Sequence, residues 1–355
     1  MSKNDEHFKN KVIIVDGYNA TGKTILPPIL DCFQNTQLPS FSYELEWFSN
    51  LYLMNEISKE TFINMINKIV DYRLYNGFIG RELNTRRGDL SSIWKSSKLF
   101  KLISKIINLD DNKLYLEGAK SNQILVLTIT QAFNNFKIFS RALNDRLLFI
   151  EYIRDPLYMF LQYKVLHQKV IDGDPRKDFT IRYFDKDTNR NIPPYFKDYS
   201  FTKKNHKNLD SYLIDYFENI LFSWEKIINE NKKSKNIVII PFEEFVINPY
   251  DSLKRISSFI GEDYSLSKLI FKQLQIENIP RETLTAFKGN SVYKRYGFQK
   301  MNSNTLKEER KKYMVYLNKN KGIEKKILNQ LNELSIKYYQ YLLSINYIKK
   351  SNTPI

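Results

Sequence analysis

Residues 17–24 (GYNATGKT) are the segment of this chain best suited to bind a phosphate group. They match the pattern G-x-x-x-x-G-K-[ST], in which glycines let successive backbone N–H groups face one anion and the lysine adds a positive charge. The segment directly follows the apolar run 11–16, and we expect a helix to begin near Gly22 and to run to about Phe33. The residues expected to contact phosphate are Gly17, Asn19, Ala20, Thr21, Gly22, Lys23 and Thr24.

Four apolar runs predict the strands that position this loop. Residues 11–16, 147–153 and 236–240 lack polar alternation, and 124–129 is a weaker run of the same kind. Such runs fit the strands of a parallel sheet buried on both faces, and helical patterns lie between them. The predicted fold class is therefore α/β, with a central parallel sheet flanked by helices as in P-loop nucleotide-binding proteins.

The whole chain, residues 1–355, is predicted to form one domain. Its core is expected over 11–300, with a polar surface excursion at about 175–210. The Lys-rich segment 305–350 carries apolar residues at helical spacing and is expected to form C-terminal helices.

Composition narrows the function classes. An apolar fraction of 42% argues against disorder, and the single cysteine, Cys32, cannot form an internal disulfide. The net charge of +16 favours anionic partners, or else reflects a genome that places Lys at solvated positions, and the charge alone does not separate the two. We expect no nucleic-acid partner. With no apolar run near the roughly 18 residues of a membrane span, a soluble cytoplasmic protein is predicted.

Metal-dependent phosphate chemistry would need a further carboxylate at the end of another buried strand. The three later apolar runs are followed instead by Arg154, Pro241 and Thr130. This pattern disfavours a metal-dependent NTPase, and no metal site is expected.

Two further segments resemble the cofactor signatures of the sulfotransferase family. They are residues 149–163 (FIEYIRDPLYMFLQY) and 241–256 (PFEEFVINPYDSLKRI). Together with the loop they place three blocks in the family's order, covering under a quarter of the chain: 11–30, 146–164 and 236–262.

The resemblance implies that 3′-phosphoadenosine 5′-phosphosulfate (PAPS) binds at the carboxyl ends of the strands. The loop would hold the 5′-phosphosulfate, and Arg154 would hold the 3′-phosphate through its rigid guanidinium fork. A salt bridge from Arg154 to Asp155 or Glu151 is the structural alternative. The family's serine eight residues after this arginine is replaced here by Gln162. A loop that resembles the family's Lys-Gly segment adds two further candidates for the 3′-phosphate, Lys288 and Gly289.

The catalytic residues depart from the family pattern. The usual lysine before the Thr-Gly pair is replaced by Ala20, so either Lys23 supplies the charge or the activity is altered or lost. Residues 43–48 (YELEWF) resemble the family's Glu-x-x-aromatic-aromatic stretch, which makes Glu44 the candidate base; Glu46 would share its strand face or lie a half-turn away. The histidine base of small-molecule members has no counterpart, because residues 128–131 (TITQ) stand in its place.

These residues predict a sulfotransferase that moves a sulfuryl group from PAPS to a hydroxyl or amine acceptor, with a carbohydrate as one candidate. Its partners would be the nucleotide donor and the acceptor, and no metal is needed if Lys23 and the loop amides stabilise the leaving phosphate. Two alternatives stay open: an ATP-dependent P-loop kinase, favoured by Gly22-Lys23-Thr24, and a catalytically altered nucleotide-binding protein, suggested by Ala20.

Overall fold

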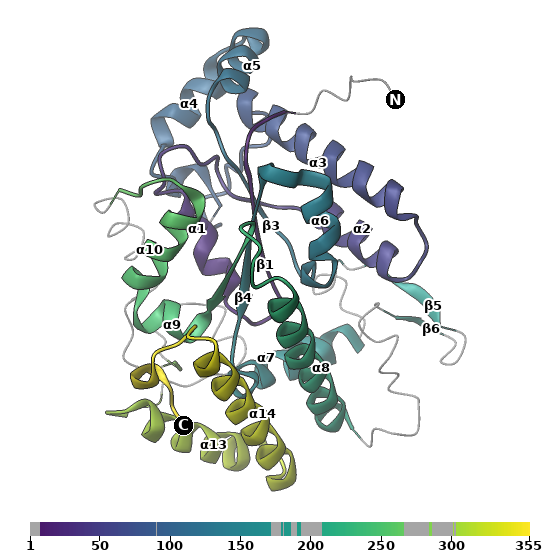
Figure 1. Ribbon diagram of the computed structural model, residues 1–355, viewed down its shortest axis with the longest axis vertical. Helices are drawn as coiled ribbons and strands as arrows, with labels where there is room; N and C mark the ends of the chain where they lie inside the picture. The colour runs from purple at the N-terminus through teal and green to yellow at the C-terminus, as the bar shows by residue number, and fades with distance from the viewer. Residues whose placement is uncertain are drawn as a thin grey trace.

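The computed structural model describes residues 8–89, 91–171, 179, 181–185, 190–192, 208–265, 284–285, 301 and 303–355. Within these residues the centre is a five-stranded sheet of order β2-β3-β1-β4-β7, in which every neighbouring pair is parallel. Helices flank the sheet, so the predicted α/β class is confirmed (Figure 1). The strands are β1 (Val12–Gly17), β2 (Ser40–Phe41), β3 (Leu125–Thr128), β4 (Leu147–Ile153) and β7 (Ile237–Pro241).

The four predicted apolar runs all form strands of this sheet. Every residue of β1, β3 and β4 is buried, which explains why these strands show no polar alternation. In the central register, Val12 pairs with Leu125 of β3 and with Leu147 of β4. The edge strand β2 was not predicted, because two residues are too few for a periodic pattern to show.

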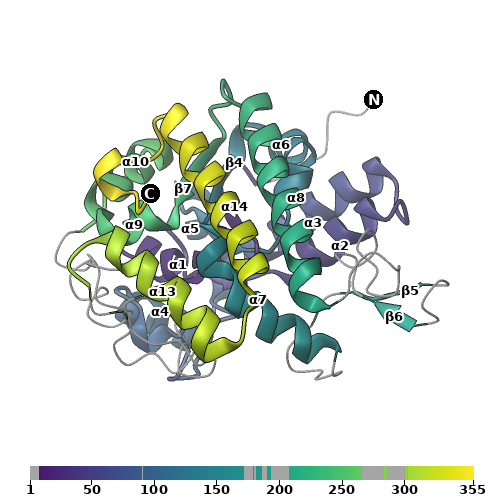
Figure 2. The same cartoon turned by 90° about the horizontal axis from the view of Figure 1, so that it is seen from below.

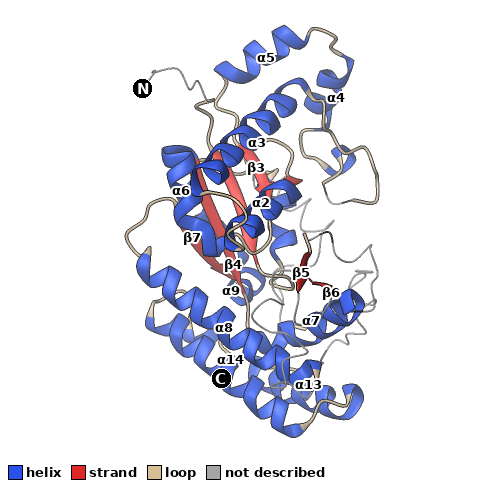
Figure 3. Cartoon of the chain, turned by 90° about the vertical axis from the view of Figure 1, so that its right-hand side faces the viewer, coloured by secondary structure: helices blue, strands red, loops and turns tan. Residues whose placement is uncertain are grey.

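Helices cover both faces of the sheet, as Figures 1 and 3 show. On the face turned to the viewer in Figure 3 lie α2 (Tyr43–Leu53), α3 (Lys59–Ile79) and α6 (Phe136–Leu143). Toward the other face lie α1 (Leu26–Leu30), α9 (Phe242–Ile247) and α10 (Pro249–Ile260).

A group of long helices lies beyond the carboxyl end of β4 (Figure 2). It consists of α7 (Pro156–Ile171), α8 (Leu209–Glu230), α13 (Leu306–Lys321) and α14 (Lys325–Ser344). α14 packs against both α7 and α8. The expected C-terminal helices are thus confirmed as α13 and α14.

Two smaller excursions leave the sheet. α4 (Leu99–Ile107) and α5 (Asp111–Lys120) lie at the end of the molecule opposite α13 (Figure 1), and β5 (Tyr183–Asp185) pairs antiparallel with β6 (Arg190–Ile192) inside the predicted 175–210 excursion. Of the rest of that excursion, the structure describes only residues 179, 181, 182 and those from Asn208 onward. The short 3₁₀ turns are Lys23–Ile25, Ile93–Lys95, Phe133–Asn135, Asn144–Arg146 and Lys350–Asn352.

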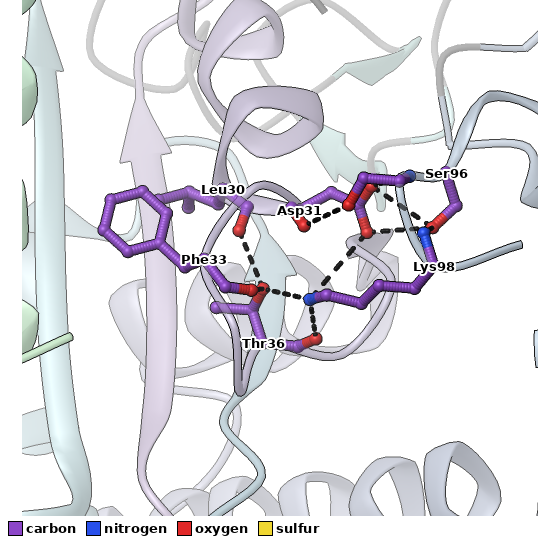
Figure 4. Close-up of polar contacts among 7 residues, drawn as sticks. Leu30, Asp31, Phe33, Thr36, Ser96 and Lys98 are labelled. Carbon is purple, nitrogen blue, oxygen red and sulfur yellow. Dashed lines mark hydrogen bonds and ion pairs between the residues drawn. The ribbon is translucent and has the colours of Figure 1, made fainter. Parts of the chain in front are cut away.

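The helix after the loop is shorter than predicted. A 3₁₀ turn at Lys23–Ile25 leads into α1, which ends at Leu30 and not near Phe33. The Thr36 hydroxyl donates to the carbonyl oxygens of Leu30 (2.7 Å) and Phe33 (3.1 Å), as Figure 4 shows. This side chain satisfies helix-end carbonyls, and the chain turns away toward β2.

The buried apolar residues form a core that reaches from Val12 to Ile348. Division of the chain into one domain stays a prediction. No helix in the described part of the chain combines the length and apolar character needed to cross a membrane.

Candidate functional site

The predicted phosphate loop leaves β1 through two positions that only glycine fits. Gly17 has φ 154° and Gly22 has φ 83°. A Cβ on Gly17 would lie 2.7 Å from the carbonyl oxygen of Tyr152, and one on Gly22 would lie 2.3 Å from the Phe242 ring. At both positions the loop backbone packs so close to its neighbours that a side chain there would clash with them.

The residues between these glycines form a tight, ordered turn. The buried Thr21 hydroxyl donates to the Tyr18 carbonyl at 2.8 Å, and the Thr21 amide reaches the same oxygen at 3.4 Å. Ala20 has φ 65°, a left-handed conformation that costs an L-residue about 1–2 kcal/mol. Among the described residues, no acceptor is found for the amides of Ala20 and Gly22.

Lys23 folds back onto the loop. Its side chain is buried, and Nζ donates to the Gly17 carbonyl and to Thr130 Oγ1, the latter at 2.9 Å. Burial lowers the pKa of Lys23, because the neutral amine is easier to remove from water than the ammonium ion. Thr24, the next residue, is exposed.

Three carboxyl groups act on Lys23 in the opposite direction. Asp16, Glu46 and Glu151 each raise its pKa by charge attraction, although burial remains the largest cause. Asp16 on β1 and Glu151 on β4 are register partners, and both side chains are fully buried. Glu151 also accepts a hydrogen bond from Trp224 Nε1 at 3.0 Å. A buried acidic pair thus lies beneath the phosphate loop.

Burial also raises the pKa values of both acids, and the charge of Asp16 raises that of Glu151 further. Two neighbouring buried carboxyls do not both ionise readily, because like charges repel strongly where water is excluded. Sequence reasoning missed this pair. The signal was present, since each is a charged residue inside or at the end of an otherwise apolar run. Within the described residues, no group of three or more His, Cys, Asp and Glu side chains is placed to hold a metal ion.

Arg154 returns to the loop from the end of β4. Its Nη1 donates to the Ala20 carbonyl at 2.9 Å, and its guanidinium lies 4.1 Å from the centre of the Phe242 ring. The side chain is only 6% exposed, and Nε has no partner among the described residues. Arg154 makes no ion pair with Asp155 or Glu151 in this part of the chain, so the alternative salt bridge is absent there.

The neighbouring acids are engaged elsewhere and hold this corner in place. Asp155 accepts hydrogen bonds from Ser335 (2.6 Å) and Arg310 (3.5 Å). Glu243, at the start of α9, accepts from the Asp155 amide (2.9 Å) and from the Tyr338 hydroxyl (2.8 Å). Burial, followed by the charge of Asp155, raises the pKa of Glu243 to about 7. These contacts tie α9 and α14 to the end of β4, next to Arg154.

The two glutamates of α2 lie on different sides of the helix. Glu44 accepts from Arg73 Nη2 at 2.5 Å and from Ser42 Oγ at 3.0 Å, and its side chain is 39% exposed. Glu46 is buried, and its charge acts on Lys23. Residues i and i+2 are about 200° apart around a helix, so only one of them can face the loop. Sequence reasoning selected Glu44 for the catalytic role, whereas the structure turns Glu46 toward Lys23.

The remaining candidates for the 3′-phosphate are less defined. Gln162 lies on α7, two turns after Arg154, and is partly buried. It makes no hydrogen bond with a described residue. Lys288 and Gly289 lie outside the described residues.

An aromatic wall from α8 borders the loop and was not predicted. The ring centre of Tyr18 lies 5.8 Å from that of Trp224 and 6.4 Å from that of Tyr216. Asn134 donates to the Tyr18 hydroxyl at 3.4 Å, and Gln131 donates to the Tyr216 hydroxyl at 3.2 Å. Their separation in sequence, from residue 18 to residue 224, leaves no local motif that would reveal the wall.

Comparison with known proteins found no matching family model and no matching curated protein. Similar solved structures include the sulfotransferase domain of the Synechococcus PCC 7002 olefin synthase, with 13% identity, a TM-score of 0.41, and coverage of 95% of this chain and 98% of that one. Sulfotransferase STF9 from Mycobacterium avium matches with 11% identity and a TM-score of 0.39, covering 96% of this chain and 78% of that one. Mouse sulfotransferase SULT7A1 complexed with PAP matches with 12% identity and a TM-score of 0.34, covering 92% of this chain and 89% of that one.

Proposed function

We propose that this chain is a PAPS-dependent sulfotransferase whose acceptor carries a hydroxyl or an amine, with a carbohydrate as one candidate. The observation that carries the proposal is the contact between Arg154 and the Ala20 carbonyl. It joins the two segments that would hold the two phosphate ends of PAPS, although they are 134 residues apart in the sequence. A phosphate loop that bound its ligand without help from another strand would not need an arginine placed beside it.

Donor binding is assigned to groups that can exchange their present contacts for phosphate. The loop amides and Lys23 would bind the 5′-phosphosulfate, with Gly17, Asn19, Thr21 and Thr24 in the same loop. Arg154 would bind the 3′-phosphate through its fork, and its unpartnered Nε fits that role. Gln162, Lys288 and Gly289 are proposed as further contacts to the same phosphate.

The proposed reaction forms a bond between the acceptor oxygen or nitrogen and sulfur, and it breaks the bond between sulfur and the 5′-phosphate oxygen. The leaving phosphate gains the negative charge, and Lys23 with the loop amides would stabilise it there. The acceptor loses a proton to a base. PAP and the sulfated acceptor are the products, and no oxidant, reductant or metal enters the balance.

Glu46 is the better placed of the two glutamates to take that proton. It is buried on the side of α2 where its charge acts on Lys23, whereas Glu44 is held in an ion pair with Arg73. A base must come within hydrogen-bond reach of the acceptor proton. The place of the side chain in the structure is therefore a better guide to the base than the resemblance to a family motif. Glu44 stays the candidate from the sequence, and matched variants separate the two.

An ATP-dependent kinase is the second candidate, because the exposed Thr24 follows Lys23 as in metal-dependent phosphate loops. A catalytically altered nucleotide-binding protein is the third, since Ala20 occupies the family's lysine position. A thermal-shift comparison separates the candidates: PAP without metal against ATP with Mg²⁺. At about 100 times its dissociation constant, PAP should add about 2.7 kcal/mol to the free energy of unfolding.

Stabilisation by PAP, together with sulfated product formed from PAPS, would support the transferase. Stabilisation by ATP with Mg²⁺ and none by PAP would replace it with the kinase. Binding of PAP with no turnover on any hydroxyl or amine acceptor would favour the altered protein.

A further inference from the structure

A cavity of about 260 Å³ lies on the β2 side of the sheet, away from the phosphate loop. Its walls are the segment 31–41 after α1, the end of α3, the helix α4 and the start of β3. None of its lining residues belongs to the loop 17–24, and neither Lys23 nor Arg154 reaches it. Its size is close to the lower end of small-molecule sites, about 300 Å³.

The cavity has more positive than negative lining charge, and part of that charge is already neutralised. Lys98 lies between Asp31, at 4.0 Å, and the carbonyl and hydroxyl oxygens of Thr36, at 2.6 and 2.9 Å (Figure 4). Arg73 pairs with Glu82 in the same wall. Both lining carboxylates are therefore ion-paired, Asp31 with Lys98 and Glu82 with the arginine that also contacts Glu44.

Lys101 and Lys105 remain as an excess of positive charge. Lys101 is exposed, and its ammonium group makes no hydrogen bond or ion pair with a described residue. The Lys105 ammonium donates to the Gly77 carbonyl. Burial, and then the charges of Lys101 and Lys98, lowers the pKa of Lys105 to about 8. Lysines that repel one another in a cavity would be stabilised by an anionic group placed between them.

Amide side chains contribute part of the remaining lining. Many lining side chains are amides, which offer both donors and acceptors: Gln34, Asn35, Gln37, Asn76, Asn84 and Gln123. Asn76 is fully buried, and its Oδ1 accepts no hydrogen bond from a described residue. Such an acceptor is satisfied by a ligand hydroxyl or by water.

An aromatic surface begins at the mouth of the cavity. Phe41 lines the cavity and is 42% exposed, and its ring stacks on that of Tyr43 with centres 5.9 Å apart. Tyr43 in turn stacks on Trp47 at 6.4 Å. Exposed aromatic rings of this kind can pack against the C–H faces of sugar rings while the sugar hydroxyls stay in water.

We propose that this cavity binds an anionic sugar unit of an oligosaccharide, with Lys101 and Lys105 on its carboxylate or sulfate and the Phe41–Tyr43 surface under the neighbouring sugar. The amides of the lining would hold the ring hydroxyls. The site does not require sulfuryl transfer, and its occupation is independent of the nucleotide.

The test is a calorimetric titration of the full chain, without nucleotide, with two matched ligands. One is a hyaluronan tetrasaccharide, and the other is the same tetrasaccharide with its carboxylates reduced to alcohols. The charged form should bind at least about tenfold more tightly, because a charge-assisted contact is lost in the reduced form. Equal affinities, or no saturable binding of the charged form, would overturn the proposal.

Variants then assign the contribution of each wall. Lys101→Ala should weaken the charged tetrasaccharide about tenfold and leave the reduced one unchanged. Phe41→Ala should weaken both forms by the same factor, since ring stacking does not depend on the charge. Lys113→Ala, on the exposed side of α5, is the matched control and should change neither. If Lys101→Ala has no more effect than Lys113→Ala, the anionic sugar is not held in this cavity.

A final arm separates a sugar from a bare anion. Inorganic sulfate should compete with the tetrasaccharide only weakly, because it reaches neither the amides nor the aromatic surface. Competition by sulfate at the same concentration as the tetrasaccharide would overturn the saccharide assignment.

Discussion

Asp16 and Glu151 face each other across two adjacent parallel strands, and both carboxyls are completely buried within electrostatic reach of Lys23. Their pKa values are raised, so a single shared proton would leave the pair with one negative charge. That charge opposes the effect of burial on Lys23. We infer that the pair keeps the loop lysine in its ammonium form.

Replacing both acids by amides, Asp16→Asn with Glu151→Gln, should lower the pKa of Lys23 further. As the pH rises, Lys23 should then lose its proton earlier than in the wild-type chain. The pH at which the affinity for PAP begins to fall should therefore be lower in the double variant. The measurement is the dissociation constant of PAP between pH 6 and 9. Adding Lys23→Arg to the double variant supplies the control, because arginine stays charged throughout this range. An unchanged pH dependence would show that the acids do not act on Lys23.

Lys23→Ala should reduce turnover on the order of a hundredfold to a thousandfold, as expected for the loss of one preorganised donor to a developing charge. The fold should persist, since the Lys23 ammonium donates hydrogen bonds only to Gly17 and Thr130 among the described residues. Turnover from PAPS and the melting temperature are the two measurements. Thr24→Ala, at the exposed neighbouring position, should cost far less in a reaction without metal. Equal losses for the two variants would instead favour the kinase.

Arg154→Ala should remove most of the preference for PAP over adenosine 5′-phosphate. Charge-assisted hydrogen bonds contribute about 1.5–3 kcal/mol each, so the wild-type chain should bind PAP at least about tenfold more tightly. Affinity for adenosine 5′-phosphate should barely change in the variant. Arg154→Lys is the matched control, which keeps the charge and loses the fork. Equal wild-type affinities for the two nucleotides would contradict the assignment.

Glu46→Gln and Glu44→Gln form a pair that tests the base. Loss of Glu46 should lower kcat by about a hundredfold or more, within the usual range of general base catalysis, and should remove the acidic limb of the pH–rate profile. Glu44→Gln should leave kcat close to wild type, because that carboxylate is neutralised by Arg73. The reverse outcome would return the role to Glu44.

Because His167 is buried, we expect the free energy of unfolding to fall in acid. The histidine is buried among the rings of Tyr163, Tyr212 and Tyr216, and burial lowers its pKa to about 3. The unfolded chain takes up a proton at about pH 6.5, whereas the folded chain does not, so stability falls as the pH drops from about 6.5 toward 3.

At pH 5 this loss is about 2 kcal/mol, and above about pH 7 it vanishes. Chemical denaturation of wild type and His167→Phe at pH 5 and pH 7.5 measures it. The free energy of unfolding of the variant, relative to that of the wild-type chain, should be higher at pH 5 than at pH 7.5. A constant difference between the two chains would rule out His167 as the titrating group.

The sheet could be predicted because its strands are local features. Each of the four apolar runs is buried on both faces. Burial on both faces requires consecutive apolar residues, such as Val12 to Val15, and such a run can be read directly from the sequence. The helix after the loop was predicted too long, because the hydroxyl of Thr36 closes it from outside the helical pattern.

Glu44 and Glu46 show what the sequence left undecided. On a strand these residues would share a face, and on a helix they point apart. Sequence patterns left the element undecided, so the choice of base followed the resemblance to a known motif. The helix α2 then placed Glu46 on the buried side and Glu44 beside Arg73.

The sequence by itself determined the glycine turn at 17–22, the strands around it and the position of Arg154 at a strand end, because each of these depends on neighbouring residues. The tertiary structure alone decided which distant groups meet. It paired Asp16 with Glu151, brought Arg154 to Ala20, and formed the cavity that Lys101 and Lys105 line. Parallel strands are joined by long crossovers, and the register between them follows from packing of the whole sheet and its helices. No local pattern carries that information.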